Sequence, residues 1–244
     1  MKSSPMPPAG EEAGAAAGQN SVADDFSAAN DRAHSQTDAT GMTGHPAEPP
    51  APNPNPLSRA KVFGIGLSKT GTSSLTQALR ILGYRSIHYP PLDNMLSILA
   101  GYDAATDTTI ACCYDQLDVL YPNSKFILTV RDVKSWLVSA EREFAGRPVN
   151  EGWKQTVRTY LYGAKEWDPG KFADGYRRHC QGVETYFRHR PLDLLTMNIV
   201  AGEGWGVLCS FLGTPAPTQP FPHCNSTRYA SACDLAETRP CPKG

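Results

Sequence analysis

A loop rich in hydroxyl groups has the composition of an anion-binding site. The run Lys69-Thr-Gly-Thr-Ser-Ser74 supplies one ammonium group and several hydroxyls. It follows an apolar segment, residues 62–67, and it leads into residues 73–82, where leucines recur at helical spacing. The loop is therefore predicted to join a strand to the N-terminus of a helix, where unpaired N–H groups and the helix dipole attract anions. The predicted anion ligands are Ser68, Lys69, Thr70, Gly71, Thr72, Ser73 and Ser74.

The position of the lysine distinguishes this loop from the P-loop that binds nucleoside triphosphates. That motif reads G-x-x-x-x-G-K-[ST], and the frame from Gly66 to Ser73 fits it except that Thr72 takes the place of the lysine. The lysine instead lies three residues upstream, at Lys69. We therefore expect Lys69 to contact a shorter group, near the first phosphate. The alternative is an ordinary turn between strand and helix, with the lysine in solvent.

A second candidate anion site follows the most apolar strand of the sequence, residues 126–130. Arg131 comes directly after that strand, and Ser139 lies eight residues further along. The two side chains are predicted to hold a second phosphate at the same sheet edge as the loop. The alternative is that Arg131 pairs with Asp132 and that Ser139 is a small surface residue. Asp132 is predicted to cap the helix that follows it.

The elements that position these residues alternate between strand and helix. Such alternation predicts an α/β fold with a parallel, doubly wound sheet whose ligand lies beyond the carboxyl ends of the strands. Besides residues 62–67 and 126–130, the predicted strands are residues 85–89 and 193–197. The predicted helical segments are residues 73–82, 92–100, 113–121, the stretch after Asp132, 150–167, 171–188 and 204–212.

Composition predicts one folded domain between two tails. Of the 244 residues, 40% are hydrophobic and 19% are charged, but residues 1–58 consist mainly of small residues and proline. We predict a disordered tail over residues 1–58, because so few apolar side chains cannot offset the entropy lost on ordering. The domain is then expected over residues 59–228, with an irregular tail at residues 229–244.

Charge and hydropathy predict a soluble, cytoplasmic protein. The formal net charge is −1, so no nucleic-acid partner or acidic membrane surface is indicated. No signal-peptide core is present at the start, and no run approaches the roughly 20 apolar residues that span a bilayer. The seven cysteines form no C-x-x-C pair, so no metal site is predicted. The alternative is a protein of an oxidising compartment, with a disulfide near the C-terminus and a glycosylation sequon at Asn225.

The two anion motifs resemble those of the P-loop sulfotransferases. Lys69–Ser74 after a strand, and Thr129–Asp132 followed by Ser139, are similar to the two cofactor motifs of that superfamily. The similarity spans residues 61–225 and is greatest with a compact bacterial and fungal branch. Its further matching segments are residues 101–107, 120–132, 204–205, 211–213 and 220–223.

The resemblance implies a three-layer P-loop fold that uses 3′-phosphoadenosine 5′-phosphosulfate (PAPS) as sulfuryl donor, without a metal. It implies that Lys69 stabilises the departing phosphate and that Thr72, Ser73 and Ser74 hold the 5′-phosphate. Arg131 and Ser139 are implied to bind the 3′-phosphate.

The catalytic base is expected among three residues, with Asp107 preferred over His88 and Asp103. A sulfotransferase needs a group that takes the acceptor proton. Asp107 matches the position of an aspartate in this branch, although Thr108 and Thr109 stand where relatives often carry a proline.

Two other functions remain open on the sequence, and the acceptor is not specified. One is an ATP-dependent small-molecule kinase, with Asp132 as a Mg²⁺ ligand; the other is a non-catalytic nucleotide-binding protein. The acceptor is expected to be a small molecule or a glycan carrying a hydroxyl or an amine. Its pocket is expected from the loop around residues 88–107 and from the helical segment 144–188, which carries Tyr160, Tyr162, Trp167, Tyr176 and Tyr186. The sequence does not indicate an oligomeric state.

Overall fold

The computed structural model describes residues 60–149 and 152–224. The predicted tails at residues 1–58 and 229–244 lie outside these described residues, as does Asn225. The strands are β1 (Val62–Gly64), β2 (Ser86–His88), β3 (Ala104–Thr106), β4 (Lys125–Thr129) and β5 (Leu194–Met197). The helices are α2 (Thr72–Ile81), α3 (Met95–Leu99), α4 (Thr108–Ala111), α5 (Tyr114–Leu120), α6 (Val133–Phe144), α7 (Trp153–Tyr162), α8 (Pro169–Phe187) and α9 (Trp205–Leu212). Two short 3₁₀ turns are η1 (Leu92–Asn94) and η2 (Ile199–Ala201).

The five strands form one parallel sheet in the order β2-β3-β1-β4-β5. The predicted α/β fold with a parallel sheet is therefore confirmed. The register places His88 and Gly64 opposite Thr106, and Gly64 opposite Ile127, so the carboxyl ends of these strands meet at one edge. Loops that leave this edge are close in space, which is why parallel α/β sheets bind ligands there.

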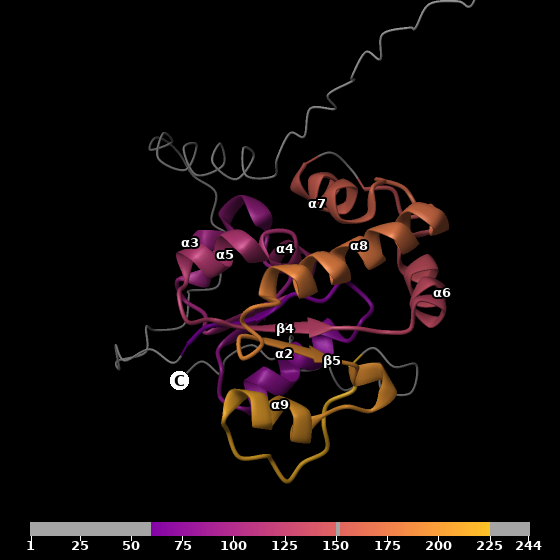
Figure 1. Cartoon of the computed structure of the whole chain (residues 1–244). Coiled ribbons are helices and arrows are strands. Elements are labelled where there is room, and N and C mark those ends of the chain that lie inside the picture. Colours follow the sequence, from indigo (N-terminus) through magenta and orange to yellow (C-terminus); the bar gives the residue numbers. More distant parts are fainter. Residues whose placement is uncertain (1–59, 150–151, 225–244) are drawn as a thin grey trace, which may run out of the picture. The chain divides into compact units, whose positions relative to one another are not determined.

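Helices cover both faces of the sheet, which confirms the three-layer arrangement (Figure 1). On one face lie α2 and α9, whose Leu75, Leu79 and Leu208 pack with Val62 and Ile127. On the other face lie α4, α5 and α8. There the rings of Phe63, Phe126 and Phe187 form a chain, with ring centroids 5.6 and 4.8 Å apart. The alternation of Val62 and Phe63 thus buries one side chain in each layer.

The prediction of a loop around residues 88–107 is wrong in part, because residues 104–106 form the strand β3. The run Ala104-Ala-Thr106 is short and lacks bulky β-branched residues, so its pattern does not indicate a strand. The small side chains suit its place in the sheet. Thr106 lies so close to Gly64 that a Cβ at Gly64 would be 2.7 Å from Thr106 Cγ2.

The three helices that follow Arg131, which are α6, α7 and α8, begin or end at identifiable residues. Asp132 accepts a hydrogen bond from the backbone N–H of Ser135, which confirms that it caps α6. The helix predicted over residues 150–167 is shorter, because α7 ends at Tyr162 and Gly163, with φ 74°, caps it. The next helix begins earlier than predicted, because Asp168 caps α8 and Pro169 occupies its first turn.

No helix within residues 60–149 and 152–224 is long and apolar enough to cross a bilayer.

Candidate active site

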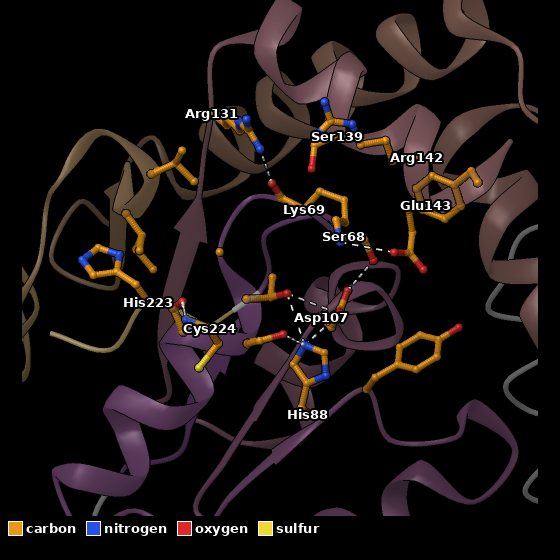
Figure 2. A pocket seen from close by; sticks show the side chains of 18 of the residues that line it. Ser68, Lys69, His88, Asp107, Arg131, Ser139, Arg142, Glu143, His223 and Cys224 are labelled. Atoms are coloured by element: carbon orange, nitrogen blue, oxygen red, sulfur yellow. Dashed lines mark hydrogen bonds and ion pairs between the residues drawn. The ribbon is translucent and has the colours of Figure 1, made fainter. Parts of the chain in front are cut away.

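A cavity of about 630 Å³ opens at the carboxyl edge of the sheet (Figure 2). Each strand end contributes to its wall: Ser68 to Ser74 follow β1, His88 ends β2, Asp107 follows β3, Arg131 follows β4 and Ile199 follows β5. The fold therefore brings the two predicted anion sites and both leading base candidates into one cavity. Of the predicted anion ligands, Thr70 alone does not line this cavity.

The loop after β1 is fixed by contacts that require glycine at position 66. A Cβ on Gly66 would lie 1.9 Å from Thr129 Oγ1 and 2.7 Å from the Thr129 carbonyl oxygen. The chain therefore passes directly against the end of β4. This close approach places the loop beside Arg131, which follows β4 by two residues.

Thr70 belongs to the scaffold of the loop, which corrects its expected role as an anion ligand. Its side chain is fully buried. Its hydroxyl donates to the carbonyl of Leu67 at 2.6 Å and lies 2.6 Å from Thr129 Oγ1. These contacts turn the hydroxyl inward, away from the cavity.

Two buried side chains anchor the carbonyl groups of the loop from the opposite layer. The indole N–H of Trp136 donates to the Ser68 carbonyl at 2.9 Å. His179 Nε2 lies 2.7 Å from the Ile65 carbonyl, and because a carbonyl only accepts, this nitrogen carries the proton. Burial lowers the pKa of His179 to about 4, with the nearby Arg178 lowering it further and the Ile65 carbonyl opposing both. His179 is therefore a neutral donor that orients the entry to the loop.

Lys69 extends from the loop to α6, where it meets a carboxylate. Its Nζ lies 3.2 Å from Glu143 Oε2, and Figure 2 shows this contact across the cavity. The other oxygen of Glu143 lies 3.2 Å from Arg147 Nη1. Glu143 therefore bridges two cations, and the contact that an incoming anion would make with Lys69 is taken by a side chain.

His88 and Asp107 form a hydrogen-bonded pair at the floor of the cavity. His88 Nε2 lies 2.9 Å from Asp107 Oδ2, while Thr72 and Ser73 hydroxyls lie 3.3 and 3.2 Å from the same nitrogen. Figure 2 shows the second ring nitrogen of His88 on the side away from Asp107. The two base candidates therefore contact each other, and His88 also contacts the predicted phosphate ligands Thr72 and Ser73.

Asp107 is deeply buried and heavily bonded, which favours its charged form. Only 5% of the residue is exposed, and its Oδ1 accepts from Ser68 Oγ at 2.9 Å and from the Thr108 N–H at 2.7 Å. Burial on its own raises the pKa of Asp107, but the hydrogen bond and charge of His88, with the bonds from Ser68 and Thr108, hold it below its usual value. A carboxylate in this state accepts a further proton poorly. It is suited to orient His88 and to stabilise its protonated form.

Arg131 is held at the rim by three neighbours. Its Nε donates to Ser135 Oγ at 3.0 Å, and its Nη1 lies 3.5 Å from the Lys69 carbonyl. The buried Tyr176 hydroxyl accepts from the Arg131 N–H and donates to the Arg131 carbonyl, both at 2.8 Å. Ser139 lines the same cavity four residues, or about one turn, beyond Ser135 on α6, on the side that Figure 2 shows facing Lys69.

Backbone strain concentrates at the cavity. Four non-glycine residues of the described chain have positive φ, and Lys69, Tyr89 and Asp107 among them line the cavity. Such conformations are costly for residues with a Cβ and occur preferentially at functional sites.

Several cavity residues are not identified by sequence reasoning, and several expected ones lie elsewhere. Asp103 is bound to Arg85, with a 3.1 Å contact between its Oδ1 and Arg85 Nη2, and does not line the cavity. None of the aromatic residues expected to form the acceptor pocket lines it either: Tyr160, Tyr162, Trp167, Tyr176 and Tyr186. Tyr89, Phe144 and Arg158 line the cavity and fall within the two segments expected to form the acceptor pocket, although they were not named individually. The cavity residues outside any expected site are Arg142, Glu143, Ile199, Val200, His223 and Cys224.

Some of the missed residues carry a signal in retrospect. Arg142 and Glu143 follow Ser139 by three and four residues, so helical spacing places them near its face. Cys224 has no such signal; its N–H donates to Ser74 Oγ at 2.9 Å because the segment after α9 returns to α2.

The charge and shape of the cavity fit an anionic ligand of nucleotide size. Four cationic side chains, Lys69, Arg131, Arg142 and Arg158, line the cavity against the carboxylates of Asp107 and Glu143. The first turn of α2 adds N–H groups that have no acceptor within the helix. The volume lies in the range of about 300–1,000 Å³ that is typical of ligand sites. Within the described ranges, no group of three or more metal-ligating side chains is present.

Comparison with known proteins adds two matches. A family model described as "Sulfotransferase domain" matches residues 61–95 and 90–230, which include every residue of the cavity. The chain is also 26% identical to "Ava biosynthesis cluster protein M" of Aspergillus versicolor, in an alignment that covers 67% of this chain and 80% of that protein.

Proposed function

Because this chain belongs to the sulfotransferase domain family, we propose that it transfers a sulfuryl group from PAPS to a hydroxyl or amine of an acceptor. The observation that carries the proposal is that one cavity joins a loop with the shifted lysine, the Arg131–Ser139 pair and the His88–Asp107 pair. A triphosphate kinase would have its lysine at the position of Thr72.

The residues present fit the two anionic ends of this donor. The N–H groups and hydroxyls of Thr72 and Ser73 at the start of α2 would hold the 5′-phosphate, with Gly71 and Ser74 beside them. The guanidinium of Arg131 and the hydroxyl of Ser139 would hold the 3′-phosphate. When bound, the donor supplies a sulfuryl group whose S–O bond to the phosphate breaks as the bond to the acceptor forms.

Lys69 stabilises the negative charge that develops on the departing phosphate. A preorganised donor at such a position is worth about 3–4 kcal/mol of transition-state stabilisation. Because Lys69 is paired with Glu143, the ammonium leaves that carboxylate for the phosphate oxygen when the donor binds.

We assign the base to His88 and the orienting role to Asp107. The Asp107 carboxylate is committed to Ser68, Thr108 and His88, and its side chain is 7% exposed, whereas the His88 side chain is 31% exposed. His88 Nε2 donates to Asp107, so its other ring nitrogen is the proton acceptor. The acceptor proton passes to that nitrogen, and Asp107 stabilises the resulting imidazolium.

Calorimetry with 3′-phosphoadenosine 5′-phosphate (PAP) in excess EDTA tests the donor site, with adenosine 5′-phosphate and Mg·ATP titrated in parallel. Micromolar or tighter binding of PAP, and much weaker binding of the other two, is the expected result. Binding of Mg·ATP alone would replace the proposal with a kinase. PAP binding followed by no transfer from labelled PAPS to any member of a hydroxyl and amine library would indicate a non-catalytic nucleotide-binding protein.

A further inference from the structure

Arg158 presents an immobilised guanidinium to the cavity. The residue lies on α7, and its Nη1 donates to the carbonyls of Arg147 and Lys165, both at 3.1 Å. Its guanidinium carbon lies 4.8 Å from the ring centre of Phe144, so the flat group stacks on an aromatic face. These contacts fix the side chain before any ligand arrives, which reduces the entropy cost of binding.

The hydrogen bonds of Arg158 leave one edge of the guanidinium available. Among residues 60–149 and 152–224, no ion pair engages Arg158, and its hydrogen bonds use Nη1 only. Nε and Nη2 carry the parallel N–H groups that bind the two oxygens of a carboxylate. A partly buried arginine with this edge unsatisfied is a site for a planar anion.

Arg158 makes no direct hydrogen bond or ion pair with the residues assigned to the donor, although the charge of Glu143, the partner of Lys69, acts on it. Arg131 contacts Ser135, Tyr176 and the Lys69 carbonyl, none of which contacts Arg158. Arg158 packs on Phe144, and its charge acts on Tyr89, the residue that follows His88. Tyr89 in turn lies against Trp153 of α7, with ring centroids 5.4 Å apart. Aromatic side chains therefore lie between the His88 side of the cavity and Arg158.

We propose, on the premise of the function above, that the acceptor carries a carboxylate which Arg158 binds through Nε and Nη2. The apolar body of the acceptor packs on Phe144 and Tyr89, and its hydroxyl or amine lies at His88. The acceptor class is then a hydroxy acid or amino acid derivative with an aromatic or apolar body, and a neutral sugar or lipid alcohol is disfavoured.

Matched acid and amide probes test this assignment by binding rather than by turnover. The probes are 4-hydroxybenzoate, 4-hydroxyphenylacetate and 3-(4-hydroxyphenyl)propionate, each paired with its primary amide, titrated into protein saturated with PAP. We expect at least one acid to bind at least tenfold more tightly than its amide, because charge-assisted bidentate bonds are roughly twice as strong as neutral ones. If no acid exceeds its amide, the carboxylate assignment is wrong.

Variants of Arg158 identify the side chain responsible. Arg158→Gln is expected to reduce the acid-to-amide affinity ratio to about one, and Arg158→Lys to restore part of it. Arg188→Gln removes an exposed arginine at the end of α8 and is expected to keep the ratio. An unchanged ratio in Arg158→Gln would overturn the proposal.

PAP affinity and thermal unfolding of each variant separate this inference from its premise. Arg158→Gln is expected to bind PAP within about threefold of the wild-type affinity, because Arg158 is not among the residues assigned to hold the donor. Failure of the wild-type protein to bind PAP would contradict the proposed function itself. Loss of PAP binding in Arg158→Gln alone would instead move Arg158 into the donor site.

Discussion

At the scale of single residues, Lys69 is held by a carboxylate at the place where an anion would compete for it. The 3.2 Å contact with Glu143 orders the lysine in a loop whose backbone has φ 71° at that residue. Under the proposed function, donor binding would exchange one anionic partner of Lys69 for another. The contact that preorganises the lysine would then lower the affinity for the donor.

Glu143→Gln is expected to tighten PAP binding several-fold, and Lys69→Ala is expected to weaken it. In the double variant the gain from Glu143→Gln should disappear, because it acts through the lysine. Calorimetry with PAP on the wild type, the two single variants and the double variant gives the coupling free energy between Glu143 and Lys69. Glu141→Gln, on the exposed face of α6, is the matched control. Additive effects in the cycle would show that Glu143 does not act on Lys69. With an acceptor in hand, Lys69→Ala is further expected to abolish transfer.

Arg131 is expected to discriminate nucleotides by the 3′-phosphate. Arg131→Ala should weaken PAP by at least tenfold while adenosine 5′-phosphate loses little affinity, since charge-assisted bonds to phosphate are lost only for the first ligand. Titration of both nucleotides into the variant and into Arg188→Ala gives the comparison. Equal losses for the two nucleotides would remove Arg131 from the 3′-phosphate site.

His88 is expected to matter for proton transfer far more than for donor affinity. His88→Asn should lower transfer by about 10²–10⁴-fold, the range of general acid–base catalysis, while PAP affinity changes much less. His189→Asn, which replaces an exposed histidine just after α8, is the matched control. Transfer from labelled PAPS to the acceptor found in the screen is the measurement. Full transfer activity in His88→Asn would show that His88 is not the general base and would favour Asp107 in that role.

At the scale of elements, the link between β1 and α2 depends on contact with the end of β4. Gly66 touches Thr129 so closely that no larger residue fits without movement, and Thr70 hydrogen-bonds the same threonine. The position of the anion loop is therefore set by a neighbouring strand as well as by its own sequence.

Gly66→Ala is expected to lower the free energy of unfolding by about 1–3 kcal/mol or more, the usual cost of overpacking. PAP binding should fall as well, because the loop must move from Thr129. Urea unfolding and calorimetry provide the measurements. Gly182→Ala within α8 is the matched control; its new Cβ would meet only the Tyr114 hydroxyl, at 3.6 Å, and helix propensity predicts a gain of up to about 1 kcal/mol. Equal changes in the free energy of unfolding and in PAP affinity for the two variants would show that the contact of Gly66 with Thr129 does not position the loop.

At the scale of the whole molecule, the buried His179 couples α8 to the base of the loop and makes stability depend on pH. Its pKa is about 4 in the folded protein, below the ordinary value of 6.5, so between these values the unfolded chain binds more protons. The stabilisation is fully present above pH 6.5 and is lost as pH falls toward 4, on the order of 3 kcal/mol in total. The carboxylates with lowered pKa, such as Asp107, add stabilisation that is fully present above their usual pKa of 3.8 and is lost only below it.

His179→Gln is expected to flatten the pH dependence of the unfolding free energy between pH 6.5 and 4. Denaturant unfolding at half-unit pH steps measures the slope in each protein. His189→Gln replaces an exposed histidine just after α8 and should retain the wild-type slope. The same slope in His179→Gln and wild type would assign the pH dependence to other groups.

The sequence by itself determined the fold class and the two anion motifs, because both are local. A strand, a turn rich in glycine and hydroxyls, and an amphipathic helix follow from residue spacing, as does Arg131 at the end of a buried strand. The parallel sheet then follows from their alternation, and parallel strands share one carboxyl edge. Ser68, Lys69, Gly71 to Ser74, Arg131 and Ser139 were therefore placed together without coordinates, and all line the cavity.

Only the tertiary structure decided how residues from different elements meet. The strand β3 is too short and too small in side chains to be detected by pattern, yet its insertion between β2 and β1 brings Asp107 beside His88. Thr70 looked equivalent to its neighbouring hydroxyls, and its inward orientation depends on Thr129, which is 59 residues away. Glu143 and Arg158 enter the cavity because α6 and α7 pack over the same edge. Such contacts depend on chain crossovers, which residue spacing does not encode.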